Sequence, residues 1–270
     1  RFFTKALRDM GYLKFDEPFS SLVHQGVILG PDGNRMSKSK GNVISPDEYV
    51  GKYGSDAFRL YLMFGFSYVE GGPWNTAGLE SIVRFMERVE RLVVKSIDLG
   101  AAKGEYGKAE KDLDFVRHST IKRASDDLKV FSFNTAIARL MEFVNAMYKY
   151  MDGKVNAAFL RECVEDFVLL IAPFAPHFAE ELHEMLGHKE SVFKCAYPTC
   201  DEKALVRDEY EMAVQVNSRV KAKIVVPADA DNKAIEDMAL QDGNVKAALG
   251  DLKPVKVIVI PKRIVNIVAK

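Results

Sequence analysis

A short basic segment near the N-terminus contains the residue types that bind phosphate groups. It has three cations, two serines and no acid, and it reads Asn34-Arg35-Met36-Ser37-Lys38-Ser39-Lys40-Gly41-Asn42. Cations neutralise polyphosphate charge, hydroxyls and free amides bond phosphate oxygens, and glycine lets the backbone approach a ligand closely. Composition alone leaves two interpretations open, a phosphate-binding loop and an ordinary solvated surface loop. The segment does not match the glycine-rich P-loop of NTPases.

Short elements on both sides must position this segment. The apolar run Val27–Leu29 predicts a buried strand, and residues 30–34 form a cluster of turn residues. A helix is predicted to begin at Pro46, with Ser45 as its cap and Glu48 completing a capping box. The N-terminus of that helix directs a partial positive charge towards the basic segment.

The rest of the chain predicts a helical bundle followed by a small mixed module. From about residue 75 apolar residues recur at helical spacing, and short links between helices favour an antiparallel bundle. After Pro198 the period changes to that of strands, which predicts a ββααββ unit whose first turn is Asn217-Ser218. The predicted fold class is therefore mainly α with an α+β part. The further predicted elements are helices at 56–63, 75–99, 110–129, 134–151, 156–172, 176–186, 231–241 and 243–249, and strands at 212–226, 255–260 and 263–268.

Composition limits the possible classes of protein. The chain has 38 basic and 38 acidic residues, so any nucleic-acid contact must come from local basic patches. Its three cysteines, Cys163, Cys195 and Cys200, lack metal-ligand spacing and indicate reduced thiols. His177 and His183 are six residues apart, off one helical face, so no metal site is predicted. No apolar run approaches the length of a membrane span.

The basic segment resembles the KMSKS signature of the class I aminoacyl-tRNA synthetases, with Arg35 in place of the first lysine. The resemblance continues through residues 40–43, 46–47 and 53–59. Segments 2–11, 15–19 and 72–75 resemble the leucine-specific members, and 171–177 resembles the leucine, isoleucine and valine enzymes. The closing module, with 215–217 and 256–268, is the part that favours leucine.

The resemblance implies fold and activity together. It implies three domains: the end of a Rossmann-type catalytic domain (1–72), an anticodon-binding-like helical domain (73–205) and a C-terminal tRNA-binding domain (206–270). It implies a ligase that uses ATP and Mg²⁺ to activate leucine and then charges tRNA(Leu). Lys38, Ser37 and Ser39 are then the catalytic candidates. The residues implied to bind ATP are Arg35, Met36, Ser37, Lys38, Ser39 and Lys40.

Some features of such enzymes are not in this sequence. The family's His-Ile-Gly-His element is not found, and residues 1–8 resemble a helix entered in its middle. We therefore expect the chain to be part of a longer protein whose upstream region holds that element, the leucine pocket and an editing domain. The chain alone is expected to be inactive, and the whole protein to be cytoplasmic, monomeric and not membrane-bound.

A second basic pattern lies in the closing module. Arg219, Lys221 and Lys223 alternate along a predicted strand and should share one face of the sheet, while Lys262 and Arg263 lie at a turn. Two interpretations stay open, an ordinary polar face and a tRNA-phosphate contact, and the resemblance favours the second.

Two alternatives to a leucine ligase remain at this point. One is a non-enzymatic RNA-binding module whose basic loop has no catalytic role, and the other is an isoleucine or valine enzyme of the same class. Trp74, the only tryptophan in the sequence, is interpreted as a packing anchor at a domain junction.

Overall fold

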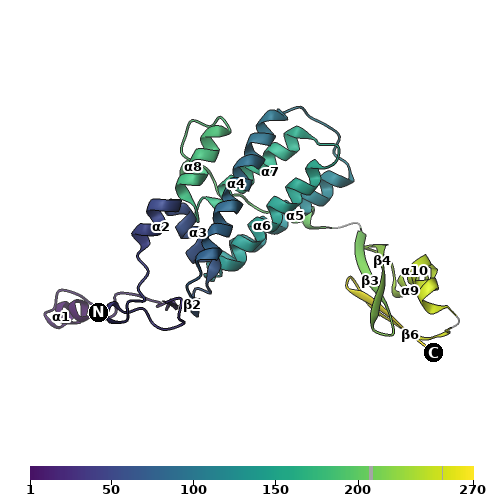
Figure 1. The fold of residues 1–270 in the computed structure, drawn as a ribbon, viewed down its shortest axis with the longest axis horizontal. Helices are drawn as coiled ribbons and strands as arrows, with labels where there is room; N and C mark the ends of the chain where they lie inside the picture. Colours follow the sequence, from purple (N-terminus) through teal and green to yellow (C-terminus); the bar gives the residue numbers. More distant parts are fainter. Residues whose placement is uncertain (207–208, 251) are drawn as a thin grey trace. The chain divides into compact units, whose positions relative to one another are not determined.

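The computed structural model describes residues 1–206, 209–250 and 252–270. These residues form two compact units, Arg1–Cys200 (unit 1) and Asp201–Lys270 (unit 2) (Figure 1). The predicted fold class is confirmed, since unit 1 is largely helical and unit 2 is a small α+β module. Unit 1 holds most of the first two predicted domains together, and the border between them at residue 72 stays a prediction.

Unit 1 consists of helices and one short parallel sheet of two strands, β1 (Val27–Leu29) and β2 (Gly71–Pro73). Its helices are α1 (Phe2–Asp9), α2 (Pro46–Tyr53), α3 (Ser55–Gly65), α4 (Thr76–Asp98), α5 (Lys108–Lys129), α6 (Phe133–Met151), α7 (Ala157–Ile171) and α8 (Pro176–Met185), with the 3-10 turns η1 (Lys38–Lys40) and η2 (Val192–Lys194).

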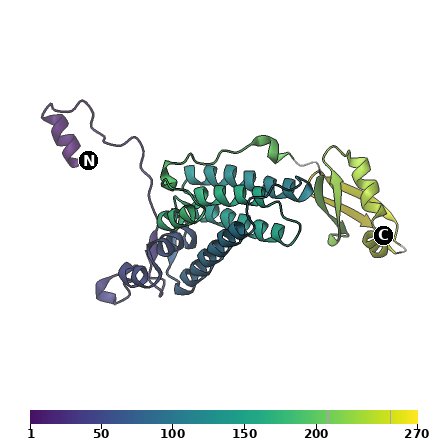
Figure 2. The ribbon, with the colours of Figure 1, turned by 90° about the horizontal axis from the view of Figure 1, so that it is seen from above.

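The four long helices α4, α5, α6 and α7 lie side by side in both views of unit 1 (Figures 1 and 2). Each buries an apolar stripe at helical spacing, as the sequence predicts, and burial of these side chains is the main stabilising contribution. Within the described ranges, no helix has the length and apolarity needed to cross a bilayer. The buried residues of the α4 stripe are Leu79, Ile82, Phe85, Val89, Leu92 and Val93.

Trp74 joins the short sheet to the helices around it. Its backbone N–H donates to the carbonyl of Leu29 over 3.0 Å, which extends the pairing of β1 with β2. Its ring, only 6% exposed, lies 4.8 Å from the Tyr49 ring of α2 and 4.9 Å from the Tyr61 ring of α3. Trp74 is therefore the packing anchor that the sequence predicts.

The close approach of β1 to β2 requires glycine. Gly71 has φ +72°, and a Cβ there would lie 2.2 Å from the carbonyl oxygen of Val27. Any larger residue would push the strands apart. Since β1 leads directly into the basic segment, this contact fixes where that segment begins.

Helix α3 carries the side chain that completes the N-terminus of α8. The cap residue of α8 is Ala175, which has no acceptor in its side chain, and Pro176 follows it. The carboxylate of Asp56, 5% exposed, accepts a hydrogen bond from the Phe178 N–H over 2.6 Å and lies 3.0 Å from His177 Nδ1. Asp56 thus replaces the missing cap from a distant part of the chain.

One turn further along α3, Arg59 holds the turn that precedes α8. Its guanidinium donates to the carbonyls of Phe174 and Pro173, over 3.2 and 3.1 Å. Tyr61, also on α3, accepts from the Asn75 N–H over 2.8 Å at the start of α4. Polar side chains of one helix therefore satisfy backbone groups at two places in the bundle.

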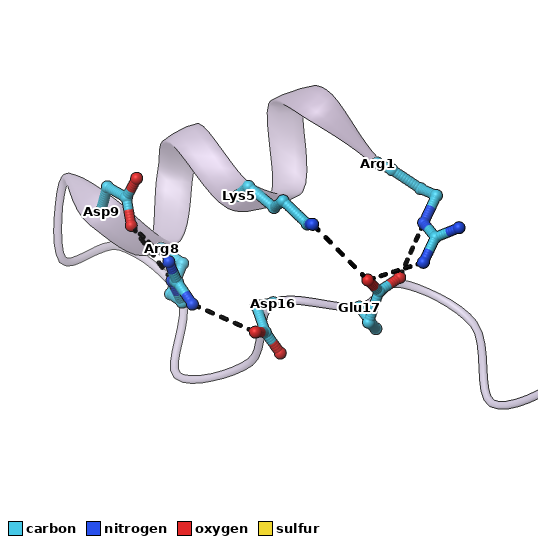
Figure 3. Close-up of polar contacts among 6 residues, drawn as sticks. All are labelled: Arg1, Lys5, Arg8, Asp9, Asp16 and Glu17. Atoms are coloured by element: carbon cyan, nitrogen blue, oxygen red, sulfur yellow. Dashed lines mark hydrogen bonds and ion pairs between the residues drawn. The ribbon is translucent and has the colours of Figure 1, made fainter.

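At the other end of unit 1, helix α1 is held by charged contacts and buries none of its residues. Figure 3 shows Arg1 and Lys5 meeting Glu17, at 2.7 and 3.8 Å, and Arg8 meeting Asp16 at 3.1 Å. These pairs are exposed, so each contributes little to stability.

Unit 2 is a four-stranded sheet covered on one face by two helices. The strand order is β4-β3-β6-β5, with β3 parallel to β6 and the other neighbours antiparallel. The helices pack over a core that includes Met212, Val214 and Ile267. The elements are the 3-10 turn η3 (Glu202–Leu205), β3 (Glu209–Val216), β4 (Arg219–Pro227), α9 (Asn232–Gln241), α10 (Gly243–Leu249), β5 (Pro254–Ile260) and β6 (Ile264–Ala269).

The predicted turn between β3 and β4 is confirmed. Asn217 and Ser218 both have positive φ, 48° and 67°, as a two-residue hairpin turn requires. Strict alternation with the buried Ala222 and Ile224 would bury Val220 as well, but Val220 is 58% exposed. A register shift at Val214/Gln215 interrupts the alternation of inward and outward side chains there.

The predicted start of α2 is confirmed, but its capping box is not. Pro46 is the first helical residue and Ser45 is the cap position, yet the Ser45 side chain makes no capping hydrogen bond. Asp47 and Glu48 in the first turn complement the helix dipole instead.

Replacing Asp56 with alanine is expected to lower the free energy of unfolding by about 2 kcal/mol, because the Phe178 N–H loses its acceptor in a buried site. Urea unfolding of the 270-residue chain measures this. Asp56→Asn, which keeps an oxygen acceptor, should lose less. Glu80→Ala, at an exposed position of α4, is the control. Equal stability of Asp56→Ala and Glu80→Ala would contradict the capping role.

Candidate phosphate-binding loop and nucleic-acid face

The basic segment is a loop that closes on itself between β1 and α2. Gly30 N–H donates to the Asn34 carbonyl over 2.8 Å, and Leu29 and Arg35 form an isolated bridge. The chain then makes the single 3-10 turn η1, which ends at Gly41 in the left-handed conformation, φ 66°. The loop thus returns to α2 within a few residues, and its backbone is organised before any ligand binds.

One carboxylate and one amide hold the two halves of the loop together. Asp32 Oδ1 accepts from the backbone N–H of Asn34 over 3.1 Å and from Asn42 Nδ2 over 3.2 Å. Asn42 Oδ1 in turn accepts from the Ser37 N–H over 2.8 Å. Asn42 therefore links the turn at Asp32 to the start of η1.

The hydrogen bonds to Asp32 favour its ionised form. Donation by the Asn34 backbone N–H, then by the side chains of Asn34 and Asn42, lowers the pKa of Asp32 below its ordinary value. The carboxylate consequently stays charged at neutral pH and keeps the loop closed.

The sequence pattern predicts no role for Asp32 in shaping the loop, and none for Asn42 beyond its place in the basic segment. Aspartate commonly bonds the backbone N–H two residues on, as Asp32 does here to Asn34, so this spacing is a usable signal. The bond from Asn42 was not visible, because it depends on how the intervening loop folds.

The predicted ATP-binding residues all lie in this loop, with different environments. The Ser37 and Ser39 hydroxyls lie 2.7 Å apart, and one donates a hydrogen bond to the other. Met36 is half-buried and packs against the core of unit 1. Arg35, Lys38 and Lys40 are exposed, and none of them forms an ion pair with another residue in the described part of the chain. Their positive charges are therefore available to an anion.

The predicted tRNA-binding residues of unit 2 divide into two sets on the sheet. Strand register places Lys223 of β4 level with Ala213 of β3 and Ile264 of β6. Arg263 directly precedes Ile264, so it lies two strands away from Lys223 and one residue out of register with it. Arg219 is level with Val216, towards the opposite end of the sheet. The residues form a band across the sheet and not one compact cluster.

The register shift between Val214 and Gln215 also changes which cations lie on the same face of the sheet. Lys221 and Lys223 are exposed and alternate with the buried Ala222 and Ile224. Arg219 lies beyond the register shift and is level with the buried Val216, so the prediction that it shares a face with Lys221 and Lys223 is wrong.

Two of the predicted tRNA-binding lysines have partners within unit 2. Lys223 Nζ lies 2.8 Å from Glu211 Oε1, and this hydrogen bond raises the pKa of Lys223. Lys262 Nζ lies 4.9 Å from the centre of the Tyr210 ring. Lys223 is thus partly neutralised, whereas Lys262 keeps its charge over an aromatic face.

Two family models match parts of this chain. Residues 3–71 match the family model of class I tRNA synthetases (I, L, M and V), and residues 112–236 match the anticodon-binding domain of tRNA ligase. These matches and the fold place the chain among the class I aminoacyl-tRNA synthetases. The chain is 56% identical to the leucine–tRNA ligase of Caldanaerobacter subterraneus over 99% of its length, and 54% identical to that of Clostridium perfringens over 100%. It belongs to the leucine–tRNA ligase family.

The chain spans about a third (34%) of the length of these relatives. Solved structures agree with the assignment. A ternary complex of Agrobacterium radiobacter leucyl-tRNA synthetase with tRNA and LeuAMS matches all of the chain, and 35% of that protein, with a TM-score of 0.77 and 31% identity. The methionyl-tRNA synthetase of Mycobacterium tuberculosis shares the fold over 63% of the chain and 39% of that protein, with a TM-score of 0.56 and 18% identity. Leucine is thereby favoured over isoleucine and valine, and a ligase over a non-enzymatic module.

Acidification should open the loop through Asp32. Because its pKa is lowered in the folded state, its stabilising contribution is complete above the ordinary aspartate pKa of about 3.9 and is lost as the pH falls through the lower folded value. In the unaltered chain, the NMR signals of the Asn42 side-chain amide should shift over that pH range. In the Asp32→Asn variant they should not shift. The Asn217 side-chain amide, which bonds the Ala269 backbone, is the control. If the Asn42 amide signals change with pH in the same way in the unaltered chain and in Asp32→Asn, then Asp32 does not hold the loop closed.

Proposed function

We propose that this chain is the part of a leucine–tRNA ligase that carries the ATP-phosphate loop and tRNA-binding surfaces. The whole enzyme would join leucine to ATP, releasing pyrophosphate, and then transfer the leucyl group to tRNA(Leu), releasing AMP. The observation that carries the proposal is the preorganised loop, in which Arg35, Lys38 and Lys40 have no carboxylate partner among the described residues.

The loop would act mainly by electrostatics. The ammonium of Lys38 binds the ATP phosphates and offsets the charge that develops on the leaving pyrophosphate. One cation at ~4 Å in an effective dielectric of ~20 interacts by about 4 kcal/mol. Only the share gained in the transition state accelerates the reaction, so about 10³-fold is a ceiling. Ser37 and Ser39 would bond phosphate oxygens. Arg35, where the signature has lysine, would offer a planar guanidinium with several donors in place of a compact ammonium.

Other residues of the loop would play supporting roles. Lys40 adds charge near the phosphates, and Met36 anchors the loop through its contact with the core. Magnesium would enter with ATP, held largely by phosphate oxygens and water, as is usual for this ion.

The remaining surfaces of the chain would hold tRNA(Leu). The band of Arg219, Lys221, Lys223, Lys262 and Arg263 offers exposed cations for phosphate contacts. The ternary complex of the Agrobacterium enzyme contains both tRNA and LeuAMS, and all of this chain matches a part of that enzyme. This similarity supports the proposal.

Catalysis would need more than these residues. The sequence contains no His-Ile-Gly-His element and spans 34% of its relatives, so the isolated chain is expected not to charge tRNA. We further propose that the whole protein acts as a monomer in the cytoplasm.

Substituting Lys38 with alanine in a full-length ligase containing this chain should slow leucine-dependent ATP–pyrophosphate exchange by roughly 10²-fold, because the phosphate-binding charge is lost. Affinity for tRNA should change less than twofold. Lys38→Arg should retain part of the activity, and Lys52→Ala, on α2 outside the loop, should retain all of it. Normal exchange in Lys38→Ala would reject the role of the loop.

Neutralising Arg219, Lys221 and Lys223 to glutamine should weaken binding of tRNA(Leu) and reduce the slope of log affinity against log salt by about 2, because Lys223 is partly compensated. Filter binding over a range of KCl concentrations measures both. The control variant carries Lys233→Gln and Lys246→Gln, on the helices α9 and α10. An unchanged slope in the β4 variant would show that this band does not contact RNA.

A further inference from the structure

The turn between α5 and α6 holds a large aromatic residue in a backbone conformation that favours glycine. Phe131 has φ 60°, and it follows α5 at the position where many helices end in a left-handed residue, usually glycine. The Phe131 N–H donates to the Leu128 carbonyl over 3.2 Å, and the Ser132 N–H donates to the Asp127 carbonyl over 2.9 Å. Because a Cβ makes this conformation costly, a phenylalanine here needs a compensating contact.

The compensating contact is a small cluster of aromatic rings. The Phe131 ring stacks on Tyr68, with ring centres 5.2 Å apart and planes at 21° to each other. Phe133, the first residue of α6, meets both rings edge-on, at 5.3 Å from Tyr68 and 5.8 Å from Phe131. Stacked and edge-on arrangements are both favourable for aromatic pairs. Phe131 stays 38% exposed, so the stack on Tyr68 explains its position better than burial in the core does.

Tyr68 lies in the tight turn that joins α3 to β2. The Gly71 N–H donates to the Ser67 carbonyl over 2.9 Å and closes this turn. The Tyr68 carbonyl accepts from the N–H of Gly26, the residue directly before β1, over 2.6 Å. A Cβ on Gly26 would lie 2.0 Å from the Gly71 nitrogen, so the two backbones are in direct contact. Tyr68 therefore contacts the bundle through its ring and the base of the phosphate loop through its backbone.

These contacts hold one end of β1, and Trp74 holds the other. The Gly26 N–H is bonded to Tyr68 before the strand, and the Leu29 carbonyl is bonded to Trp74 at its last residue. The loop follows directly, because Gly30 begins its first turn. One fixed point sets where a short strand lies, and a second fixed point sets the direction in which it runs. Without the contact at Gly26, the strand could pivot about Leu29 and displace the cations that follow it.

We propose that Tyr68 and Phe131 are positioning residues for the ATP reaction. Their stack fixes the direction in which β1 enters the phosphate loop, and hence where Lys38 meets the ATP phosphates. The inference rests on the proposed function and adds to it a contact between the bundle and the loop that involves no RNA. Both residues act through Gly26 and the loop, and small misplacements of a catalytic charge are enough to slow a reaction.

Leucine-dependent ATP–pyrophosphate exchange by a full-length ligase containing this chain tests the proposal. Phe131→Gly removes the ring and also relieves the left-handed backbone, so this variant should fold, which urea unfolding of the 270-residue chain checks. Its kcat/KM for ATP should fall roughly tenfold, because Lys38 is misplaced, while the KM for leucine changes by less than about twofold. Tyr68→Leu removes the other ring of the stack and should give the same loss.

Conservative variants and a matched control separate positioning from general damage. Phe131→Tyr and Tyr68→Phe keep both rings and should keep normal exchange. Phe193→Ala removes an exposed ring on η2 of the same unit and should change nothing. In a Lys38→Ala background, Phe131→Gly should lower exchange by less than about a further twofold, because the charge that it misplaces is already absent.

Normal ATP kinetics in either Phe131→Gly or Tyr68→Leu would overturn the inference and leave the proposed function intact. An equal rise in the KM for leucine would also overturn it, as would a full tenfold loss on top of Lys38→Ala, because each result indicates a general loss of structure. Normal exchange in Lys38→Ala alone would reject the proposed function instead, whatever the aromatic variants do.

Discussion

The buried carboxylate of Asp56 is the contact on which the arrangement of unit 1 depends. It supplies the cap that Ala175 cannot give to α8, and it does so from α3, whose other side chains reach Trp74 and the start of α4. Trp74 in turn pairs with β1, the strand that leads into the loop. The position of the phosphate loop against the bundle is thus set by a short series of specific contacts, in which the hydrogen bonds satisfy groups that would otherwise be unpaired.

The loop combines internal order with free charge. Its shape comes from one acid, Asp32, which lies just outside the basic run and accepts hydrogen bonds from Asn34 and Asn42. If that carboxylate had instead paired with Lys38 or Arg35, the loop would be equally ordered but its charge would be compensated. Fixing the backbone with amide donors keeps the cations for a ligand, and electrostatic stabilisation of a transition state needs groups placed in advance.

The sequence was sufficient for the elements and for the loop, because both depend on local patterns. Apolar periodicity located the bundle helices, and the positive-φ turn at Asn217-Ser218 follows from residue type. Contacts between distant segments were not accessible in this way. Asp56 and Phe178 are 122 residues apart, and nothing near either one indicates the other. The exposure of Val220 depends on a register shift that alternation alone cannot predict.

A net charge of zero is compatible with binding polyanions because the charges are separated locally. The 38 basic and 38 acidic residues cancel only over the whole chain. At physiological salt the field of an exposed charge is screened within about 8 Å, so an approaching phosphate responds to its nearest neighbours and not to the total. In the bundle, some of the acids form ion pairs with arginines such as Arg117 and Arg139. The loop is left with cations that have no carboxylate partner among the described residues, and this is a place where a neutral chain can still attract phosphate.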